Sequence, residues 1–183
     1  MTKRQNELIV GKLLGNGSLE DRGNANSRLQ IRHSINQKEY VDWCYRQLKE
    51  FTCSNPKQHK EPYYFRTKSL PLFSRLRKIW YNNKKKILPI NLNLSPFSLA
   101  IWYMDDGYYD RIRKSIWICT HCFNMGDLTF LQNLLFRMKI HTGKVKDRTH
   151  YKLRVISKDT KEFIRLVRPY IVPSLLYKIG IAP

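Results

Sequence analysis

The sequence predicts an α+β protein built from two similar halves. Two apolar runs carry this prediction, residues 8–17 and 98–107, because each ends in a short polar pair and a glycine. The two glycines, Gly17 and Gly107, lie about 90 positions apart, which is the mark of an internal repeat. Alternating and helically spaced segments then follow each run in the same order. Halves of this size are small for independent stability, so we expect them to share a core.

The first half begins with a predicted helix. Thr2 and Gln5 have the spacing of a capping box that opens it. Residues 28–33 alternate between polar and apolar side chains, as a half-buried strand does. The remaining patterns predict helices over residues 37–51 and 73–81 and a strand over residues 63–67. The half therefore runs helix, two strands, helix, strand or hairpin, helix.

The second half repeats this order. Ser95 is a good N-cap and Pro96 suits the first helical position, so a helix should start there and run toward Asp105. The patterns that follow predict strands over residues 116–121 and 151–156, and helices over residues 127–140 and 160–170. Residues 82–94 are polar and then broken by a proline, which predicts a linker. We therefore divide the chain into residues 1–88 and 89–183.

The charge of the chain points to a nucleic acid partner. Thirty-four Lys and Arg stand against fourteen Asp and Glu, for a formal charge of +20. Such an excess favours a polyanion, because neutralised phosphates release their counterions. A membrane surface is the rival partner, but the sequence has no run of about 18 apolar residues and spreads its cations along the whole chain. No secretory signal is visible, so we expect an intracellular protein, encoded in a mitochondrion or chloroplast or located in bacterial cytoplasm.

Cys119 and Cys122 have the CxxC spacing of half a zinc site. No second CxxC completes the site, and His33 and His59 are only distant candidate ligands. We expect reduced cysteines in an intracellular protein, with a zinc protein as the alternative.

The pair Asp105 and Asp106 stands where the second motif helix should end. The helix dipole is negative there, so two carboxylates at that place are best explained by a bound cation. A hard ion such as magnesium accepts carboxylate, carbonyl and water ligands. A simple turn is the alternative, since Asp and Gly are favoured turn residues. The repeat at Gly15–Gly17 and the charge of the chain favour the cation site.

Four segments together resemble a known family. Residues 13–19 and 95–107 match its two motifs, and residues 82–85 and 173–178 match two further signatures in the expected order. The sequence resembles the LAGLIDADG homing endonucleases, specifically the single-chain, two-motif, intron-encoded type, over nearly its whole length. The resemblance implies two pseudo-symmetric αββαββα halves that form a saddle, with the motif helices packed at the central interface. It also implies a monomer that binds a long double-stranded DNA target through the major groove.

The resemblance implies that both DNA strands are cut with the help of divalent metal, Mg²⁺ or Mn²⁺, for which Ca²⁺ is a non-catalytic substitute. By position, Asp106 is the metal-binding acid of the second half, and its neighbour Asp105 belongs to the same site. Lys85 and Lys178 match basic residues near the family's active sites. A shift of one residue would put Lys84 or Lys86 in the place of Lys85.

The first half departs from the family at Asn16, which stands with Gly15 in the metal site where an acid is expected. An amide oxygen brings no charge and is a weaker ligand for a hard ion. The residue is either an introduced change or a natural one, in an enzyme that nicks one strand or has been repurposed for RNA splicing. A shifted alignment in which Glu20 supplies the acid is the third alternative. We expect an endonuclease impaired at Asn16, with an intron-splicing maturase or nucleic-acid-binding protein that also takes intron RNA as the alternative.

Strand alternation predicts which side chains face DNA. Leu29 and Ile31 should face the core, as should Ile116 and Ile118 in the second half. Arginine and glutamine carry donors and acceptors that match base edges in the major groove. The predicted DNA-facing residues are Arg28, Gln30, Arg32, Trp117, Cys119 and His121, with further contacts from Ser18, Glu20, Arg66, Lys68, Arg111, Arg113, Lys114, Lys144, Lys146, Arg148, Lys152 and Arg154.

Overall fold

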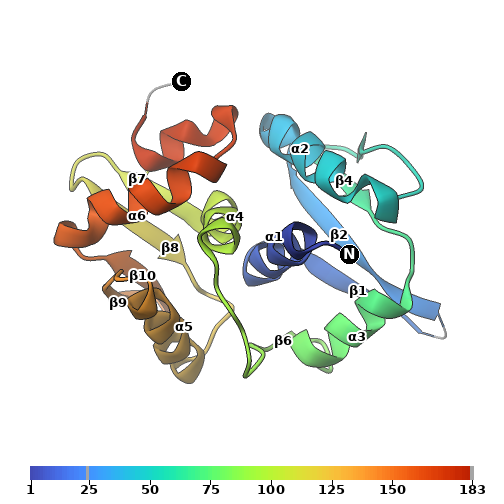
Figure 1. Ribbon diagram of the computed structural model, residues 1–183, viewed down its shortest axis with the longest axis horizontal. Coiled ribbons are helices and arrows are strands. Elements are labelled where there is room, and N and C mark those ends of the chain that lie inside the picture. The colour runs from blue at the N-terminus through green and yellow to red at the C-terminus, as the bar shows by residue number, and fades with distance from the viewer. Residues whose placement is uncertain (24, 182–183) are drawn as a thin grey trace. The chain divides into compact units, whose positions relative to one another are not determined.

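The computed structural model describes residues 1–23 and 25–181 (Figure 1). The chain divides into two compact units, Met1–Pro89 and Ile90–Pro183, which lie within one residue of the division expected after residue 88. Each unit is an α+β fold with its own four-stranded antiparallel sheet. No helix among the described residues is long and apolar enough to cross a membrane.

Unit 1 has the strand order β1-β2-β4-β3, and a two-stranded hairpin closes it. Its helices α2 and α3 pack against the sheet. Its elements are α1 (Lys3–Leu14), β1 (Ser18–Arg22), β2 (Ala25–Ser34), η1 (Ile35–Gln37), α2 (Lys38–Leu48), η2 (Lys49–Phe51), β3 (Lys57–Gln58), β4 (Pro62–Arg66), α3 (Pro71–Trp80), β5 (Tyr81–Asn82) and β6 (Lys85–Lys86).

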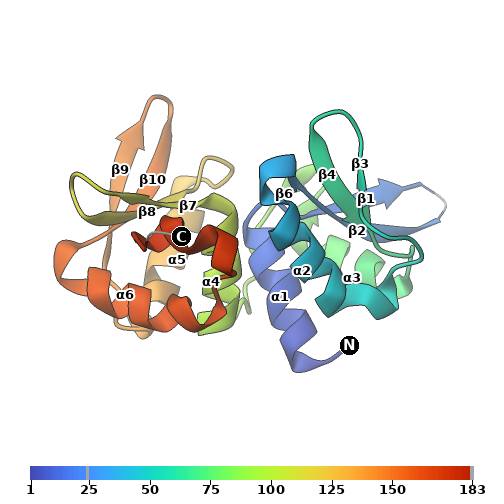
Figure 2. The same ribbon diagram turned by 90° about the horizontal axis from the view of Figure 1, so that it is seen from above.

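Unit 2 repeats the arrangement with the strand order β7-β8-β10-β9. In Figure 2, α5 and α6 lie on one side of this sheet. Its elements are α4 (Pro96–Asp106), β7 (Gly107–Asp110), β8 (Ser115–Cys119), α5 (Met125–Arg137), β9 (Thr142–Asp147), β10 (His150–Val155), η3 (Ser157–Asp159), α6 (Thr160–Val167), η4 (Arg168–Tyr170) and η5 (Pro173–Ile179). The order helix, two strands, helix, two strands, helix is therefore common to both units.

The caps predicted for the two motif helices are present. The Gln5 amide donates to Thr2 Oγ1 at 3.2 Å and the Thr2 amide donates to Gln5 Oε1 at 2.8 Å, which completes the capping box of α1. Ser95 accepts from the Ser98 amide at 3.1 Å, with Pro96 in the first turn of α4. Each cap satisfies an amide that the helix itself leaves without a partner.

The predicted linker is only partly a linker. Its first residues belong to the hairpin of β5 and β6, in which Asn82 pairs with Lys85 and Tyr81 pairs with Lys86. This hairpin lies inside unit 1 and follows α3 directly. The sequence pattern missed it because two-residue strands are too short to show any alternation.

The alternation of β2 separates a buried face from an outer face. Leu29 and Ile31 are fully buried, while Arg28 and Gln30 are half-buried and Arg32 is exposed. Ile116 and Ile118 of β8 are also fully buried. Burying side chains of this size stabilises the fold by roughly 1.5–3 kcal/mol each, which fixes the register of both strands. The face assignments predicted for these core residues are confirmed.

Candidate active site and nucleic-acid interface

Helix α4 ends at Asp106, and Gly107 begins strand β7 without an intervening loop. The Gly107 amide donates to the Tyr103 carbonyl of the last helical turn. A Cβ at Gly107 would lie 2.0 Å from Tyr103 Cδ2. The strand therefore starts so close to the helix that only glycine fits.

Lys178 supplies a cation to the end of α4. Its ammonium donates to the Met104 carbonyl at 2.6 Å and to the Asp105 carbonyl at 3.2 Å. Its own carbonyl accepts from the Tyr103 hydroxyl at 2.5 Å, so backbone and side chain both bind the helix. Lys178 is 8% exposed and lies in η5, far along the chain from α4. A positive charge at this place is favoured because the carbonyl end of a helix is negative.

Helix α1 ends in a similar way at Leu14, with Gly15 as its C-cap, but Asn16 brings an amide in place of the acid. The Gly15 amide donates to the Gly11 carbonyl at 3.1 Å and the Gly17 amide donates to the Lys12 carbonyl at 2.7 Å. Asn16, between them, is exposed. A Cβ at Gly17 would lie 2.7 Å from the Lys12 carbonyl oxygen, so this motif glycine is also required by a close approach.

Lys86, and not Lys85, brings a cation to the end of α1. The Lys86 ammonium donates to the carbonyls of Gly15 at 2.9 Å and Gly17 at 3.0 Å. Lys85 is exposed, because alternation along β6 turns it to the opposite side of the hairpin. The structure therefore places Lys86 and not Lys85 at the end of α1, a shift of one residue that the sequence left open.

Each motif end offers few ligands for a metal ion. Among the described residues there is no group of three or more His, Cys, Asp or Glu side chains that could hold one. Asp106 contributes a carboxylate and Asn16 an amide oxygen, while the Gly15 and Asp105 carbonyls already accept from lysines. This donor set suits a hard ion that keeps several waters and takes its remaining ligands from a phosphate. It does not suit a structural zinc ion, which is enclosed by four protein ligands.

Neither cysteine of the CxxC spacing is in a disulfide bond. Cys122 is exposed, and Cys119 is half-buried at the end of β8. Burial raises the pKa of the Cys119 thiol, with Lys152 acting against this. A neutral thiol is a poor zinc ligand, because the thiolate is the form that binds metal.

The outer face of the unit 1 sheet is polar and basic. Ser18 of β1 pairs with Gln30 of β2, which pairs with Arg66 of β4, so these three lie side by side across the sheet. Glu20 pairs with Arg28 in the next row. The sequence prediction that these residues share one face is met by the register. Glu20 cannot be the missing motif acid, because its carboxylate lies in β1 and binds Arg28 and Arg66.

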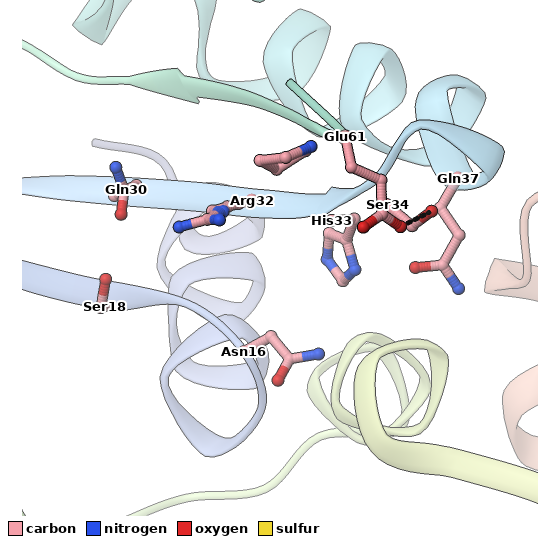
Figure 3. A pocket seen from close by; sticks show the side chains of 9 residues that line it. Asn16, Ser18, Gln30, Arg32, His33, Ser34, Gln37 and Glu61 are labelled. Carbon is pink, nitrogen blue, oxygen red and sulfur yellow. Dashed lines mark hydrogen bonds between the residues drawn. The ribbon is translucent and has the colours of Figure 1, made fainter. Parts of the chain in front are cut away.

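Asn16 lies at the edge of a hollow in this face (Figure 3). The hollow has a volume of about 460 Å³ and a mainly polar lining. Sequence reasoning found only part of that lining. The lining residues are Asn16, Ser18, Gln30, Arg32, His33, Ser34, Gln37, Glu61 and Pro62.

A buried lysine lies next to His33 of this hollow. Lys12, in the middle of α1, is fully buried, and its ammonium lies 2.8 Å from His33 Nε2. The same ammonium lies 4.8 Å from the centre of the Tyr40 ring. Sequence reasoning missed Lys12, although a lysine inside an apolar helical run is itself a signal of buried polar contacts.

The outer face of the unit 2 sheet is more aromatic. Trp117 pairs with Tyr108 on one side and with Arg154 on the other. The Tyr108 and Trp117 rings stack with centroids 6.1 Å apart, and the Arg154 guanidinium lies 5.8 Å from the Trp117 ring. Trp117 is therefore only 9% exposed, and its indole N–H donates to Ser115 at 2.9 Å. It faces outward as predicted, but neighbours cover it, so Tyr108 is the more available ring.

Asp147 organises the cations at the end of this sheet. Lys152 lies 2.7 Å from its carboxylate and His121 Nε2 lies 3.0 Å from the same oxygen. The hydrogen bond from Lys152 lowers the pKa of Asp147, and Asp147 in turn raises the pKa of Lys152. His121 lies beyond the end of β8 and stacks on His150 with ring centroids 5.3 Å apart.

The hairpin turns of unit 2 expose further cations. Arg111, Arg113 and Lys114 lie in the turn between β7 and β8, and Arg148 lies in the turn between β9 and β10. Asp110 accepts from the amides of Ile112 at 3.0 Å and Arg113 at 2.9 Å. The bonds from Arg113 hold the pKa of Asp110 below its usual value.

A model of the LAGLIDADG DNA endonuclease family matches residues 6–163, which include Gly15, Asn16 and Gly17 at the end of α1 and Asp106 and Gly107 at the end of α4. The chain belongs to this family. LAGLIDADG relatives include the cytochrome b mRNA maturase bI2 of Debaryomyces hansenii, 28% identical over 98% of this chain and 75% of the relative. The maturase of the same name from Saccharomyces cerevisiae is 29% identical over 94% of the chain, which spans only 46% of it. DNA endonuclease I-ChuI of Chlamydomonas applanata is 26% identical over 98% of the chain and 96% of its own length.

Solved LAGLIDADG structures have the same fold. The homing endonuclease I-WcaI, bound to its DNA recognition sequence, matches with a TM-score of 0.88 and 25% identity over 97% of this chain and 86% of its own. I-DmoI in complex with DNA and Mn matches with a TM-score of 0.61 and 17% identity, over 92% of this chain and 98% of its own. The α+β αββαββα fold inferred for each half is confirmed.

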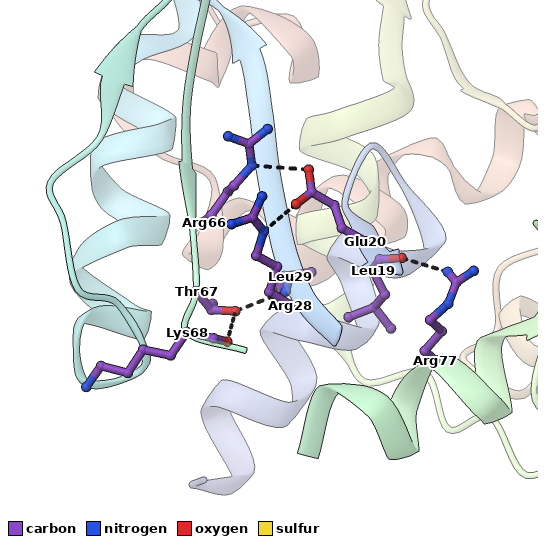
Figure 4. A network of polar contacts seen from close by, with 8 residues as sticks. All are labelled: Leu19, Glu20, Arg28, Leu29, Arg66, Thr67, Lys68 and Arg77. Carbon is purple, nitrogen blue, oxygen red and sulfur yellow. Dashed lines mark hydrogen bonds and ion pairs between the residues drawn. The ribbon is translucent and has the colours of Figure 1, made fainter. Parts of the chain in front are cut away.

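Three lysines that the sequence predicted to contact DNA do not lie on the outer faces of the two sheets. Lys144 and Lys146 pair with Leu153 and Tyr151, so alternation turns both toward the helix-covered face of their sheet. The Lys144 ammonium donates to Thr129 of α5 at 2.6 Å. Lys68 lies beyond the end of β4, and its side chain extends away from Arg28 and Arg66 (Figure 4). The register of β9 and the end of β4 therefore place these three lysines off the outer faces of the two sheets.

Proposed function

We propose that this chain is a site-specific DNA endonuclease that hydrolyses one strand of its target much faster than the other. The observation that carries the proposal is the inequality of its two motif ends. The end of α4 has the carboxylate of Asp106 next to carbonyls that Lys178 binds, whereas the end of α1 has carbonyls that Lys86 binds but Asn16 in place of an acid. The similarity to I-WcaI bound to its DNA recognition sequence and to DNA endonuclease I-ChuI supports DNA as the substrate.

The residues of the two ends have separate parts in this proposal. Asp106 would hold a divalent ion, most suitably Mg²⁺ or Mn²⁺, with Ca²⁺ as a non-catalytic substitute. When bound, the ion supplies an activated water and neutralises charge on the scissile phosphate. Lys178 is fixed by two carbonyls. Its ammonium would place a positive charge near the non-bridging oxygens of the scissile phosphate, where negative charge develops in the transition state. The I-DmoI structure with DNA and Mn supports a divalent ion.

The outer faces of the two sheets would hold the DNA. Their cations, together with the +20 charge of the chain, favour phosphates without regard to sequence. Arg28, Gln30 and Arg66 would read base edges in the major groove of a long double-stranded target. We further propose a monomeric enzyme, with two motifs in one chain, encoded by an organellar intron.

Two variants, one at each motif end, test the proposal beside the unaltered chain. The target is first selected from a randomised duplex library, placed in a supercoiled plasmid and incubated with Mg²⁺. The unaltered chain should give mainly nicked circles. Asn16→Asp should raise the yield of linear product by roughly 10- to 100-fold, because it restores a carboxylate. Asp106→Asn should lower nicking by about 100-fold or more while target binding remains.

Asn93→Asp is the matched control, because it adds the same charge at an exposed position outside the helices and strands. It should leave the ratio of nicked to linear plasmid unchanged. If the chain binds its selected target but neither it nor Asn16→Asp yields nicked or linear product, the endonuclease proposal fails.

A second candidate function is intron splicing on the same scaffold. It is favoured by the vacancy of the acid at Asn16 and by the similarity to two maturases of cytochrome b mRNA. Preferential binding of a structured intron RNA over the selected duplex at high salt would support it. If the Asp106→Asn variant keeps this preference for RNA, the motif acid is not required for RNA binding.

A further inference from the structure

Glu20 is an acidic side chain on the basic outer face of the unit 1 sheet. Its Oε2 atom accepts a hydrogen bond from Arg28 Nε, and its Oε1 atom accepts one from Arg66 Nε at 3.1 Å (Figure 4). The two arginines come from strands β2 and β4, while Glu20 comes from β1. One carboxylate therefore joins three strands of the sheet.

The geometry restrains both arginines. Arg28 pairs directly with Glu20 across the β1–β2 ladder, and Arg66 pairs with Gln30 in the next row. The Arg66 guanidinium also lies 4.9 Å from the centre of the Tyr64 ring. The side chains of Glu20, Arg28 and Arg66 are 24%, 24% and 33% exposed, so each is partly enclosed by its neighbours.

The carboxylate leaves the recognition end of each arginine available. Both arginines use Nε for Glu20, and in Figure 4 their terminal nitrogens turn away from the carboxylate. Within residues 1–23 and 25–181, no protein group takes a hydrogen bond from those terminal nitrogens. The two terminal nitrogens of an arginine form a fork that matches the O6 and N7 acceptors of guanine in the major groove.

A carboxylate on a surface that binds DNA is unfavourable in itself, because it repels phosphates. The chain has only 14 acidic residues against 34 basic ones, and one of them stands among the cations of this sheet. Restraining two flexible side chains before binding reduces the conformational entropy lost on binding, which offsets the repulsion. Arginine benefits most, since its planar fork needs a fixed orientation.

The second unit has no equivalent arrangement among its described residues. By position relative to the motif glycines, Asp110 is the counterpart of Glu20, but it accepts from the amides of its own hairpin turn. Asp147 binds Lys152 and His121, which lack the planar fork of arginine. The effect of Glu20 should therefore be confined to the part of the target that unit 1 contacts.

We propose that Glu20 is a specificity-determining positioning residue, which orients Arg28 and Arg66 to read two guanines in the target. This inference rests on the proposed DNA-binding function. Glu20 touches no base itself and acts only through the two arginines. Its loss should therefore reduce sequence preference without reducing affinity.

The experiment is enrichment of randomised duplexes by the full chain, with Ca²⁺ in place of Mg²⁺ so that bound DNA stays intact. The unaltered chain should select guanine at two positions within one half of its site. Glu20→Gln should reduce the preference for guanine at both positions by about tenfold, the scale of one bidentate arginine–guanine contact. Its affinity for mixed-sequence duplex should be unchanged or higher, because a negative charge is removed.

Arg28→Lys and Arg66→Lys assign the two positions, since lysine keeps the charge but cannot form the fork. Each should lose one guanine preference and keep the other. Glu39→Gln is the matched control, because it makes the same charge change at an exposed position on α2. It should leave the selected sequence unchanged.

Two results would overturn the inference. One is a Glu20→Gln protein that keeps both guanine preferences. The other is an equal loss of affinity for every duplex with an unchanged selected sequence, which would indicate a structural role only. If the unaltered chain enriches no duplex at all, the proposed function itself fails, and that outcome is distinct because it does not depend on Glu20.

Discussion

The two motif ends of this chain share their backbone arrangement and differ in charge. At both ends a helix passes into a strand through a glycine that has no room for a Cβ, and a lysine from the end of the same unit donates to two carbonyls. Only α4 adds a carboxylate, Asp106, where α1 has Asn16. The arrangement therefore forms without the acid. We infer that Asp106 serves a ligand and not the fold, because the fold of the other end is complete without it.

The largest expected difference between the two motif ends is the loss of stability when the motif glycine of each end is replaced by alanine. A Cβ at Gly107 would lie 2.0 Å from the ring of Tyr103, which cannot move because it is buried and bonded to Lys178. At Gly17 the nearest atom lies at 2.7 Å. We expect Gly107→Ala to lower the free energy of unfolding by about 3 kcal/mol and Gly17→Ala by about 1.5 kcal/mol, measured by urea denaturation.

Gly143→Ala is the control for both glycine variants, because no atom lies within 4 Å of the added Cβ. It should change the free energy of unfolding by less than about 0.5 kcal/mol. A larger loss for Gly17→Ala than for Gly107→Ala would contradict the ranking of the two ends.

Replacing the two lysines should also destabilise the α4 end more than the α1 end, but by a smaller margin than the glycine variants. Lys178→Met leaves two buried carbonyls without their donor and should lower the free energy of unfolding by about 2 kcal/mol. Lys86→Met should lower the free energy of unfolding by about 1 kcal/mol. The effect is smaller because Lys86 is half-buried, so water can hydrogen-bond the carbonyls that lose the lysine. Urea denaturation of the two proteins measures this.

Lys85→Met serves as the control within the same hairpin, since Lys85 is exposed. It should leave the free energy of unfolding within about 0.5 kcal/mol of that of the unaltered chain. If Lys85→Met destabilises as much as Lys86→Met, the assignment of Lys86 to the end of α1 is wrong.

The smallest effect concerns the outer face of unit 2, where Asp147 pairs with Lys152 and His121. The pKa of Asp147 is lowered from 3.8 by the hydrogen bond from Lys152, so the folded state favours the charged carboxylate. The pair should therefore stabilise the fold above pH 3.8, and this contribution should disappear as pH falls through the lowered pKa. Thermal midpoints of Asp147→Asn should lie slightly below those of the unaltered chain at neutral pH and should coincide with them in stronger acid. If the difference between the two thermal midpoints grows as the pH falls, the ionised Asp147 carboxylate does not stabilise the fold in this way.

Local patterns were enough to predict most helices and several strands. The capping box at Thr2 and the Ser95–Pro96 start depend on residues within one helical turn, and such signals survive folding. The faces of Arg28 and Arg32 followed from the two-residue period of a strand. Those predictions needed no knowledge of distant neighbours.

The sequence was not sufficient where a distant partner decides the position of a side chain. Lys144 was assigned to the DNA-facing side, but the β9–β10 register turns it toward α5. The match of residues 82–85 to a family signature favoured Lys85, and nothing local reveals the hairpin of two-residue strands that brings Lys86 to the end of α1. The contact of Lys12 with His33, and the partnership of Glu20 with Arg66, join segments that are far apart in the sequence. Tertiary contacts of this kind cannot be read from spacing.

The short hairpin that carries Lys86 also limits where this protein can be divided. A recombinant hybrid joined at residue 82, the start of the expected linker, would detach β6 from the unit whose helix it serves. The donor unit would then lose the ammonium at Gly15 and Gly17, and the recipient would gain a strand with no partner. Modular exchange of halves should therefore keep residues 81–89 with the first unit, so that the chain is cut after Pro89.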